Sequence, residues 1–502
     1  MARDETERDP AAGGRWVRPG PATRRAARNA VAVATAEMAS KVATLAYTIA
    51  AARTLGQAEF GIFGYALSFS LLVATLPAWG FDNLLIQRAS RDRGRLTTLL
   101  SETLVWRTAL AVPVFLAAGI GAFALRPDAR SATALLIVLA ATAVDVYAEA
   151  GRAAAAALED QVGTSKALIV QRFVTAGLAI GALVAGLGLI GLTLAYLAGT
   201  LVGAAGVVVS VRRLGVRVDF RSVHWPGLRT MGRLSIAVGI DAVASLALFR
   251  IDQVMLEAIK GDAAVGVYVA AYRLAETVLF LSWAVSKAVF PVMSGATESW
   301  QVRRGVEQSL AAVALVYLPF GVGLWIEAEP VLRLLFGEAY VAQGVPVAHW
   351  LAGAPMTFAL GYLGSYALFA QDRRWAIVGS TLTSLAANVA LNLVLIPRFS
   401  SAGAAAATTM SYALEGILVL ALLIPRIGMV HLHRVLAPAL LASALMGGLL
   451  LAVPAGLAVE VPLAVAIYGV GWFLLARWLA PEQLGLLRSL IPGRGRTPEA
   501  SS

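Results

Sequence analysis

The stretch ALIVQRFVTAGLAIGALVAGLGLIGLTLAYLAGT, residues 167–200, decides the fold class of this chain. Its 34 residues contain one charged side chain, Arg172. A helix needs about 20 apolar residues to cross the hydrocarbon core of a bilayer. The stretch is therefore long enough for two crossings in succession, joined near Gly191. It predicts a pair of transmembrane helices.

The composition extends this prediction to the whole chain. The 502 residues are 59% apolar and 14% charged, with a mean hydropathy of +0.74. Soluble domains are about 45–50% apolar and about 25% charged, so a soluble enzyme, a nucleic-acid-binding protein and a disordered chain are excluded. We expect an all-α, polytopic membrane protein with no nucleic acid partner.

Apolar windows of about 19 residues, ended by charged or Gly/Pro-rich clusters, give fourteen predicted spans. They lie at 29–51, 60–80, 98–124, 131–155, 167–188, 191–211, 234–256, 264–289, 309–328, 345–369, 376–396, 402–425, 435–455 and 460–479. With a cytoplasmic N-terminus, the inner segments contain 27 of the 41 Lys and Arg residues and the outer loops contain six. This positive-inside bias predicts that both termini are cytoplasmic.

An internal repeat divides the spans into two halves. RTLGQAEFGIFGYALSF at 53–69 compares with AIKGDAAVGVYVAAYRL at 258–274, and the two stretches align Gly61 with Gly266 and place Gly56 near Gly261. The stretch at 167–200 likewise parallels 376–410, with Gly191 against Gly403. The offset covers six spans, an even number, so both copies have the same orientation. Two parallel six-helix bundles, related by an axis along the membrane normal, are predicted.

The domain organisation follows from these spans. We expect a disordered basic tail at 1–28, a six-helix bundle at 29–211, a cytoplasmic amphipathic linker at 212–233, a second six-helix bundle at 234–425, two further helices at 426–479 and a cytoplasmic tail at 480–502. The linker, RRLGVRVDFRSVHWPGLRTMGR, has Val, Phe and Trp among its arginines. This pattern predicts a segment that lies on the inner leaflet.

Ionisable side chains at membrane depth cost about 2.5–3.5 kcal/mol each, so they normally face a cavity or a partner. Three groups are close enough on one helix to form ion pairs: Glu37 with Lys41, Arg273 with Glu276, and Arg152 with Asp145 and Glu149. Arg107 and Asp241 have no such neighbour on their own helix face. Acidic side chains within the spans are no fewer than basic ones, so charge counting alone does not predict a cationic cavity.

Two asparagines, Asn388 and Asn392, are one turn apart in the eleventh span. Their amides could bond to a neighbouring helix or to a sugar hydroxyl, and both alternatives stay open. The chain has no cysteine, which excludes disulfides and thiolate metal sites. It also lacks a GxxxxGK[ST] phosphate loop, an HExxH motif and a GxSxG motif. We therefore expect no catalytic residues, no metal site and no cofactor.

The stretch AARTLGQAEFGIFGYALSFSLLVATLPAWGFDNLLIQRASRD at 51–92 resembles the polysaccharide and O-antigen-type flippases of the multidrug/oligosaccharidyl-lipid/polysaccharide exporter superfamily. The matching positions of that family's pattern are Arg53, Leu55, Gly56, Phe60, Gly61, Gly80 and Arg88. Segments at 266–294, 334–351 and 392–411 are similar to further recurring segments of the family. The likeness covers about residues 30 to 425.

This resemblance implies a flippase in the bacterial cytoplasmic membrane that carries undecaprenyl-diphosphate-linked oligosaccharide from the inner to the outer leaflet by alternating access. It implies a lipid-linked glycan substrate, a coupling cation, and glycan polymerase and chain-length proteins as partners. The expected substrate-binding residues are Lys41, Arg107, Arg273, Asn388 and Asn392. The expected ion-coupling residues are Asp145, Asp241 and Glu276.

Two alternatives within the same superfamily remain. Lipid II flippases typically carry an Arg-Asp pair about ten residues before the glycine of the first loop, where this chain has Tyr47 and Thr48. Cation-coupled drug or metabolite antiporters generally stop at twelve helices, so the two C-terminal spans oppose that interpretation.

Overall fold

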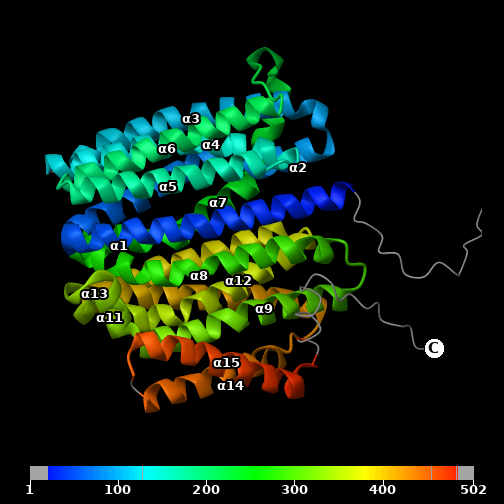
Figure 1. Cartoon of the computed structure of the whole chain (residues 1–502). Coiled ribbons are helices and arrows are strands. Elements are labelled where there is room, and N and C mark those ends of the chain that lie inside the picture. The colour runs from blue at the N-terminus through cyan, green and yellow to red at the C-terminus, as the bar shows by residue number, and fades with distance from the viewer. Residues whose placement is uncertain (1–20, 127, 454, 482, 484–502) are drawn as a thin grey trace, which may run out of the picture.

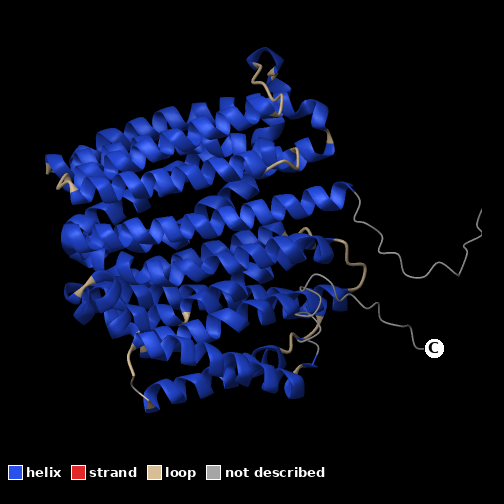
Figure 2. Ribbon diagram, in the orientation of Figure 1, coloured by secondary structure: helices blue, strands red, loops and turns tan. Residues whose placement is uncertain are grey.

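The computed structural model describes residues 21–126, 128–453, 455–481 and 483, and these residues form helices and loops with no strand (Figure 2). The elements are α1 Pro21–Ala78, α2 Phe81–Arg91, η1 Arg93–Arg95, α3 Leu96–Leu125, α4 Ala129–Ala157, α5 Val162–Val184, α6 Gly188–Arg213, η2 Phe220–Ser222, α7 Trp225–Lys260, α8 Asp262–Ser294, α9 Ser299–Ile326, α10 Ala328–Phe336, η3 Glu338–Tyr340, α11 Val341–Ala352, α12 Ala354–Ala370, α13 Arg374–Ile427, α14 Leu432–Ala452 and α15 Leu457–Leu479.

Eleven of the described helices are long and apolar enough to cross a membrane. Two of them, α1 and α13, contain a break at Gly56 and at Ser400, and each covers two of the predicted spans. The span predicted at 345–369 consists of α11 and α12, which are separated at Gly353. All fourteen predicted spans therefore lie on helices, apart from a few residues at their ends, and the all-α membrane fold is confirmed.

The structure changes two predicted boundaries. Helix α1 begins at Pro21, inside the tail predicted to be disordered at 1–28. Helix α6 continues to Arg213, and α7 begins at Trp225, inside the linker predicted at 212–233. Pro226 at the start of α7 explains the early beginning, because proline fits the first helical turn, where its missing N–H has no partner to lose. Only residues 214–224 connect the two helices. Most of the two predicted tails lies outside the described residues.

The helices run side by side in one elongated bundle (Figure 1). Helix α1 packs against α3, α4, α5 and α6, whereas α8 packs against α9, α11, α12 and α13. The first half also meets the second through α1 with α7 and α8, and through α2 and α3 with α7. We call the contact between α1 and α8 the seam. Helices α14 and α15 pack on each other, and α14 packs on α9.

The backbone supports the alignment of the internal repeat. Gly56, between the first two spans, has φ 73° and ψ 178°, and Gly261, between α7 and α8, has φ 80° and ψ 179°. This region of backbone conformation is essentially restricted to glycine. In each half, the chain therefore reverses direction between two helices at a glycine, and any other residue at that position would be strained. The symmetry axis that would relate the halves stays a prediction.

Side chains tie the two halves together at the end predicted to face outward. Nη1 of Arg126, which follows α3, lies 2.7 Å from Oδ1 of Asp262 and 3.3 Å from Oε1 of Glu257. Nε2 of Gln57 donates to the carbonyl oxygen of Ala339 at 2.6 Å. In this conformation the outer ends of the halves are joined.

Candidate functional site

A buried carboxylate in the second half is held by two arginines. Oε2 of Glu276 accepts from Nη1 of Arg273 at 2.7 Å, and Oε1 accepts from Nη2 of Arg250 at 2.8 Å. Arg273 and Glu276 are three residues apart on α8 and share a face. Arg250 comes from α7, which the turn at Gly261 folds back along α8. The predicted pair of Arg273 with Glu276 is therefore present, with a second arginine added.

Lys41 approaches this group from the first half. Its ammonium lies 5.3 Å from the ring centroid of Trp283 on α8, which is cation–π geometry across the seam. The charges of Glu276 and Arg273 act on Lys41, as does that of Arg172 on α5. The expected ion pair of Lys41 with Glu37 does not form within 4 Å among the described residues, although the charge of Glu37 also acts on Lys41.

We call Lys41, Arg172, Arg250, Arg273 and Glu276 the seam cluster. It has four basic side chains and one carboxylate. The Nε atoms of Arg172, Arg250 and Arg273 are buried, and within the described part of the chain they have no hydrogen-bond partner. Guanidinium donors suit phosphate and carboxylate oxygens geometrically. The arrangement is therefore suited to an anionic ligand, which charge counting over the sequence could not indicate.

A second polar group joins two carboxylates in the second half. Oγ1 of Thr381 on α13 lies 3.2 Å from Oδ1 of Asp241 on α7 and 3.3 Å from Oε1 of Glu415, farther along α13. One hydroxyl has one proton, so it can donate to only one of these carboxylates at a time. The described residues show no basic side chain in an ion pair with Asp241 or Glu415. The group is thus suited to hold a proton or a small cation.

Arg107 lies apart from the seam cluster. Its side chain is fully buried, and its Nη2 lies 2.8 Å from Oδ1 of Asp82 on α2, while Nη1 donates to the carbonyl oxygen of Val146. Asp82 is 25 residues earlier in the chain, so spacing along one helix could not predict this pair. The structure places Arg107 within the packing of the first half.

Asp145 takes part in the ion pairs predicted for the fourth span. Nη2 of Arg152 lies 2.8 Å from Oδ1 of Asp145 and 2.8 Å from Oε1 of Glu149. Both carboxylates therefore have a basic partner on their own helix. In this respect Asp145 differs from Asp241.

Asn388 and Asn392 are fully buried on α13, and Nδ2 of Asn392 donates to Oδ1 of Asn388 at 2.9 Å. The other amide atoms, Nδ2 of Asn388 and Oδ1 of Asn392, have no partner among the described residues. No hydrogen bond between described residues joins the two asparagines to the seam cluster. The structure thus brings Lys41, Arg273 and Glu276 together and leaves both asparagines and Arg107 elsewhere.

Sequence reasoning did not select Arg172, Arg250, Thr381 or Glu415 as site residues. All four occur within predicted spans, and three of them are charged. The signal that could have selected Arg250 is its position near the outer end of a span that turns back at Gly261 toward Arg273 and Glu276. No comparable signal joins Thr381 to Asp241, because they are 140 residues apart.

Two protein families match this chain over more than half of its length. The family described as polysaccharide biosynthesis protein matches residues 26–296. The family described as lipid II flippase MurJ matches residues 166–474. The two matches overlap and together cover nearly all predicted spans.

Two proteins of Haloferax volcanii are similar in sequence. The probable low-salt glycan biosynthesis flippase Agl15 is 27% identical over 158 residues, which is 31% of this chain and 33% of that protein. The probable flippase AglR is 27% identical over 184 residues, which is 36% of this chain and 38% of that protein. The matches thus span little more than a third of each relative.

Solved transporter structures share the fold over most of the chain. The lipid II flippase MurJ in an inward closed conformation gives a TM-score of 0.75 at 12% identity, covering 91% of this chain and all of MurJ. An inward-facing multidrug resistance MATE transporter of the MOP superfamily gives 0.64 at 13% identity, covering 80% of this chain and 98% of the transporter. At such identities these likenesses show the fold alone. By its family matches, the chain belongs to the polysaccharide biosynthesis protein family, and it also matches the lipid II flippase MurJ family over more than half of its length.

Proposed function

We propose that this protein flips an undecaprenyl-diphosphate-linked oligosaccharide from the inner to the outer leaflet by alternating access of its two halves. The observation that carries the proposal is the seam cluster, in which three basic side chains from both halves, Lys41, Arg250 and Arg273, act on the carboxylate of Glu276, and a fourth, Arg172, acts on Lys41. A diphosphate has the charge and the acceptor oxygens that would engage the unpartnered guanidinium donors. The polyprenyl tail would remain in the bilayer while the head group passes the seam.

The role of each residue follows from its place in the cluster. Lys41 and Arg172 belong to the first half, whereas Arg250 and Arg273 belong to the second. A diphosphate bound between them would interact with both halves, and its passage would accompany their rearrangement. Glu276 offsets part of the positive charge, so the site binds the diphosphate without retaining it. Arg107 has a different role in this scheme, because Asp82 already neutralises its charge.

We further propose that the coupling cation or proton binds at Asp241 and Glu415. These carboxylates share Thr381 and have no arginine partner among the described residues, unlike Asp145 and Glu276. Two negative carboxylates that share one hydroxyl group are unfavourable at membrane depth unless a proton or a cation offsets their charge. The site lies between α7 and α13, so its occupancy would influence how these helices pack.

The test is flipping by the purified protein in vesicles. A fluorescent polyprenyl-diphosphate oligosaccharide is placed in both leaflets, and an impermeant quencher is added outside. We expect the quenched fraction to rise from about half toward completion only with the protein present, since flipping exposes the lipid of the inner leaflet. Unchanged quenching, together with uptake of a fluorescent organic cation, would identify an antiporter instead.

Lipid II is the second candidate substrate, and the match of residues 166–474 to the MurJ family favours it. Tyr47 and Thr48, which stand where lipid II flippases carry an Arg-Asp pair, oppose it. Vesicles with fluorescent lipid II decide between the two. Faster flipping of lipid II than of the polyprenyl-linked oligosaccharide would replace the substrate proposed here. The bacterial cytoplasmic membrane, with both termini inside, and polymerase and chain-length partners remain part of this proposal.

A further inference from the structure

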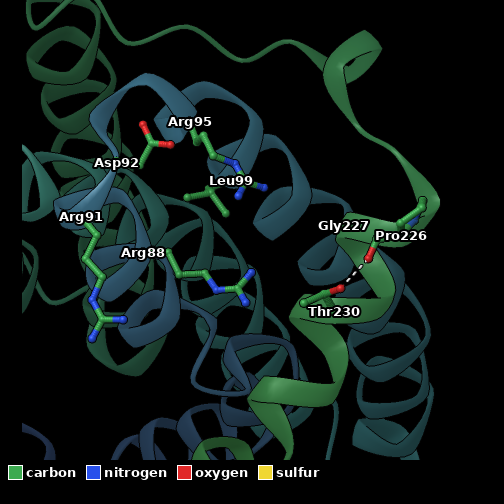
Figure 3. Close-up of a pocket in the computed structure, with 8 residues that line it drawn as sticks. All are labelled: Arg88, Arg91, Asp92, Arg95, Leu99, Pro226, Gly227 and Thr230. Atoms are coloured by element: carbon green, nitrogen blue, oxygen red, sulfur yellow. Dashed lines mark hydrogen bonds between the residues drawn. The ribbon is translucent and has the colours of Figure 1, made fainter.

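An open cavity of about 530 Å³ lies where α2 ends and α7 begins (Figure 3). Arg88 and Arg91 come from the last turn of α2, and Arg95 comes from η1. The opposite wall is formed by the first two turns of α7, with Pro226 and Thr230. The positive-inside distribution predicts that this end of the bundle is cytoplasmic. We call this cavity the arginine pocket.

The three guanidinium groups of the pocket have no direct partner among the described residues. In the part of the chain that the structure describes, the guanidinium groups of Arg88, Arg91 and Arg95 donate no hydrogen bond and lie within 4 Å of no carboxylate oxygen, although the backbones of Arg88 and Arg95 bond to that of Asp92. The carboxylate of the pocket, Asp92, accepts from the backbone N–H of Gly94 at 3.1 Å instead. By contrast, the neighbouring Arg93 pairs with Glu159 at 3.3 Å. The pocket therefore offers three unused sets of donors for an anion.

The arginines differ in direction. In Figure 3 the side chains of Arg88 and Arg95 extend toward α7, whereas Arg91 points away from Thr230. Behind the pocket, the buried carboxylate of Glu102 interacts with the charges of Arg95 and Arg88. Together with Asp92 it offsets at most two of the three arginines, so the net charge of the pocket stays positive. Glu102 also packs against Gly227, where an added Cβ would lie 1.9 Å from Oε1. Arg88 and Arg95 are thus the pair placed to hold one ligand.

Exposed apolar side chains next to the pocket indicate its depth in the membrane. Trp225, the first residue of α7, is 71% exposed, and Phe220 of η2 is 61% exposed. Arg217, Arg221 and Arg229 alternate with them in the sequence. Aromatic rings beside basic residues are typical of the level of the lipid headgroups. The pocket therefore opens where lipid phosphates are concentrated.

The pocket is built from both halves of the chain. Nε1 of Trp106 on α3, the helix that follows Arg95, donates to the carbonyl oxygen of Leu228 on α7 at 3.0 Å and so joins α3 to the α7 wall. Farther along α7, the absence of a side chain at Gly232 and Gly239 lets the rings of Trp106 and Trp79 pack against the helix. A headgroup in the pocket would contact α2 and α7 at once, unlike a lipid on the outer face of one helix.

We propose that the arginine pocket binds the phosphate headgroup of an anionic phospholipid of the inner leaflet. The phosphate would be held by Arg88 and Arg95, with the acyl chains along the apolar surface of the bundle. This site is separate from the seam cluster and does not depend on the proposed function. Free inorganic phosphate offers the same chemistry without acyl chains, and the experiment distinguishes the two.

The experiment measures lipid binding to the purified full chain in detergent by native mass spectrometry and by the thermal unfolding midpoint. The ligands are phosphatidylglycerol, phosphatidylcholine and inorganic phosphate. The variant is Arg88→Gln/Arg95→Gln. The matched control is Arg303→Gln/Arg304→Gln, which removes the same charge near the same end of the bundle from α9. Unfolding without lipid shows whether each variant is folded.

We expect phosphatidylglycerol to bind at least about tenfold more tightly than phosphatidylcholine, because guanidinium groups and an anionic headgroup form charge-assisted hydrogen bonds. The variant should lose this preference and the control should keep it. Equal loss in variant and control would show a general charge effect and overturn the proposal. Equal binding of the two lipids, or stabilisation by inorganic phosphate as large as that by phosphatidylglycerol, would also overturn it.

Discussion

Gly61 of α1 and Gly266 of α8 make reciprocal contacts with the backbone of the opposite half. A Cβ added at Gly61 would lie 1.8 Å from the carbonyl oxygen of Asp262, and a Cβ at Gly266 would lie 2.0 Å from that of Gln57. Both pairs of equivalent residues are 205 positions apart. Such an exchange of partners is typical of a two-fold contact. The seam therefore closes at two glycines that the internal repeat predicted to be equivalent.

Substitution of Gly61 by alanine should weaken this closure. The new methyl group would overlap the backbone of α8, which cannot rotate away as a side chain can, and overpacking costs about 1–3 kcal/mol. We expect a lower unfolding midpoint, and we expect thiol reagents to react faster with a cysteine introduced into the seam. The chain has no cysteine of its own, so all labelling would come from the introduced one. Gly177→Ala on α5 is the control, since nothing lies within 4 Å of an added Cβ there. Equal behaviour of the two variants would contradict the close contact.

Lys41 and Glu276 should differ in their effects on stability. Without Lys41, Glu276 keeps two arginine partners, so Lys41→Met should leave the unfolding midpoint nearly unchanged while flipping falls about tenfold or more. Glu276→Gln leaves Arg250 and Arg273 without their carboxylate, and loss of one member of a buried pair costs about 3–5 kcal/mol. The measurements are unfolding in detergent and flipping in vesicles. The control, Lys166→Met, removes an exposed lysine. Normal flipping by Lys41→Met would remove Lys41 from the proposed site.

Asp241 and Glu415 should govern coupling. We expect Asp241→Asn and Glu415→Gln to lose the stimulation of flipping by an imposed proton or sodium gradient. Flipping without a gradient should persist, because the seam cluster is intact. Rates with and without each gradient provide the measurement. Asp145→Asn, whose carboxylate has an arginine partner, should retain the stimulation. If only Asp145→Asn lost the stimulation, the coupling site would be at Asp145 in the first half and not at Asp241 and Glu415.

The pair of Arg107 and Asp82 should be structural. Removal of Arg107 leaves Asp82 without its counter-ion, so Arg107→Met should destabilise the protein by about 3 kcal/mol, whereas the double variant Arg107→Met/Asp82→Leu should recover much of that loss. Unfolding midpoints of the four proteins in the cycle measure this coupling. Flipping by the stable double variant then decides whether Arg107 binds substrate, since a substrate-binding arginine would leave the double variant folded and inactive.

Glu327, between α9 and α10, should make stability depend on pH. Burial raises the pKa of its carboxyl, and the nearby Glu460 raises it further. A carboxyl with a raised pKa in the folded state contributes stability at low pH, and this contribution is lost as pH rises through that pKa. We expect Glu327→Gln to unfold at a higher temperature than the natural chain at pH 8 and at the same temperature at pH 4. Glu329→Gln, which removes an exposed partner of Arg333, should show no such gain.

The sequence by itself determined the membrane fold, because hydrocarbon leaves a backbone no partner for its hydrogen bonds except its own helix. Apolar runs such as 167–200 therefore predict helices without knowledge of their neighbours. The glycines at 56, 61, 261 and 266 also revealed the repeat, since each is required by a backbone turn or a close backbone contact. The sequence did not predict that α7 begins at Trp225, because Arg229 and Arg233 make its first turns too polar to be counted in a membrane span.

Only the tertiary structure decided which charges from distant parts of the chain share a site. Arg107 meets Asp82, Glu276 meets Arg250, and Asp241 meets Glu415 through Thr381, although none of these pairs lies within two turns of one helix. The physical reason is that helical periodicity fixes the face of a residue only relative to its own helix axis. The rotation of each helix toward its neighbours depends on packing over its whole length.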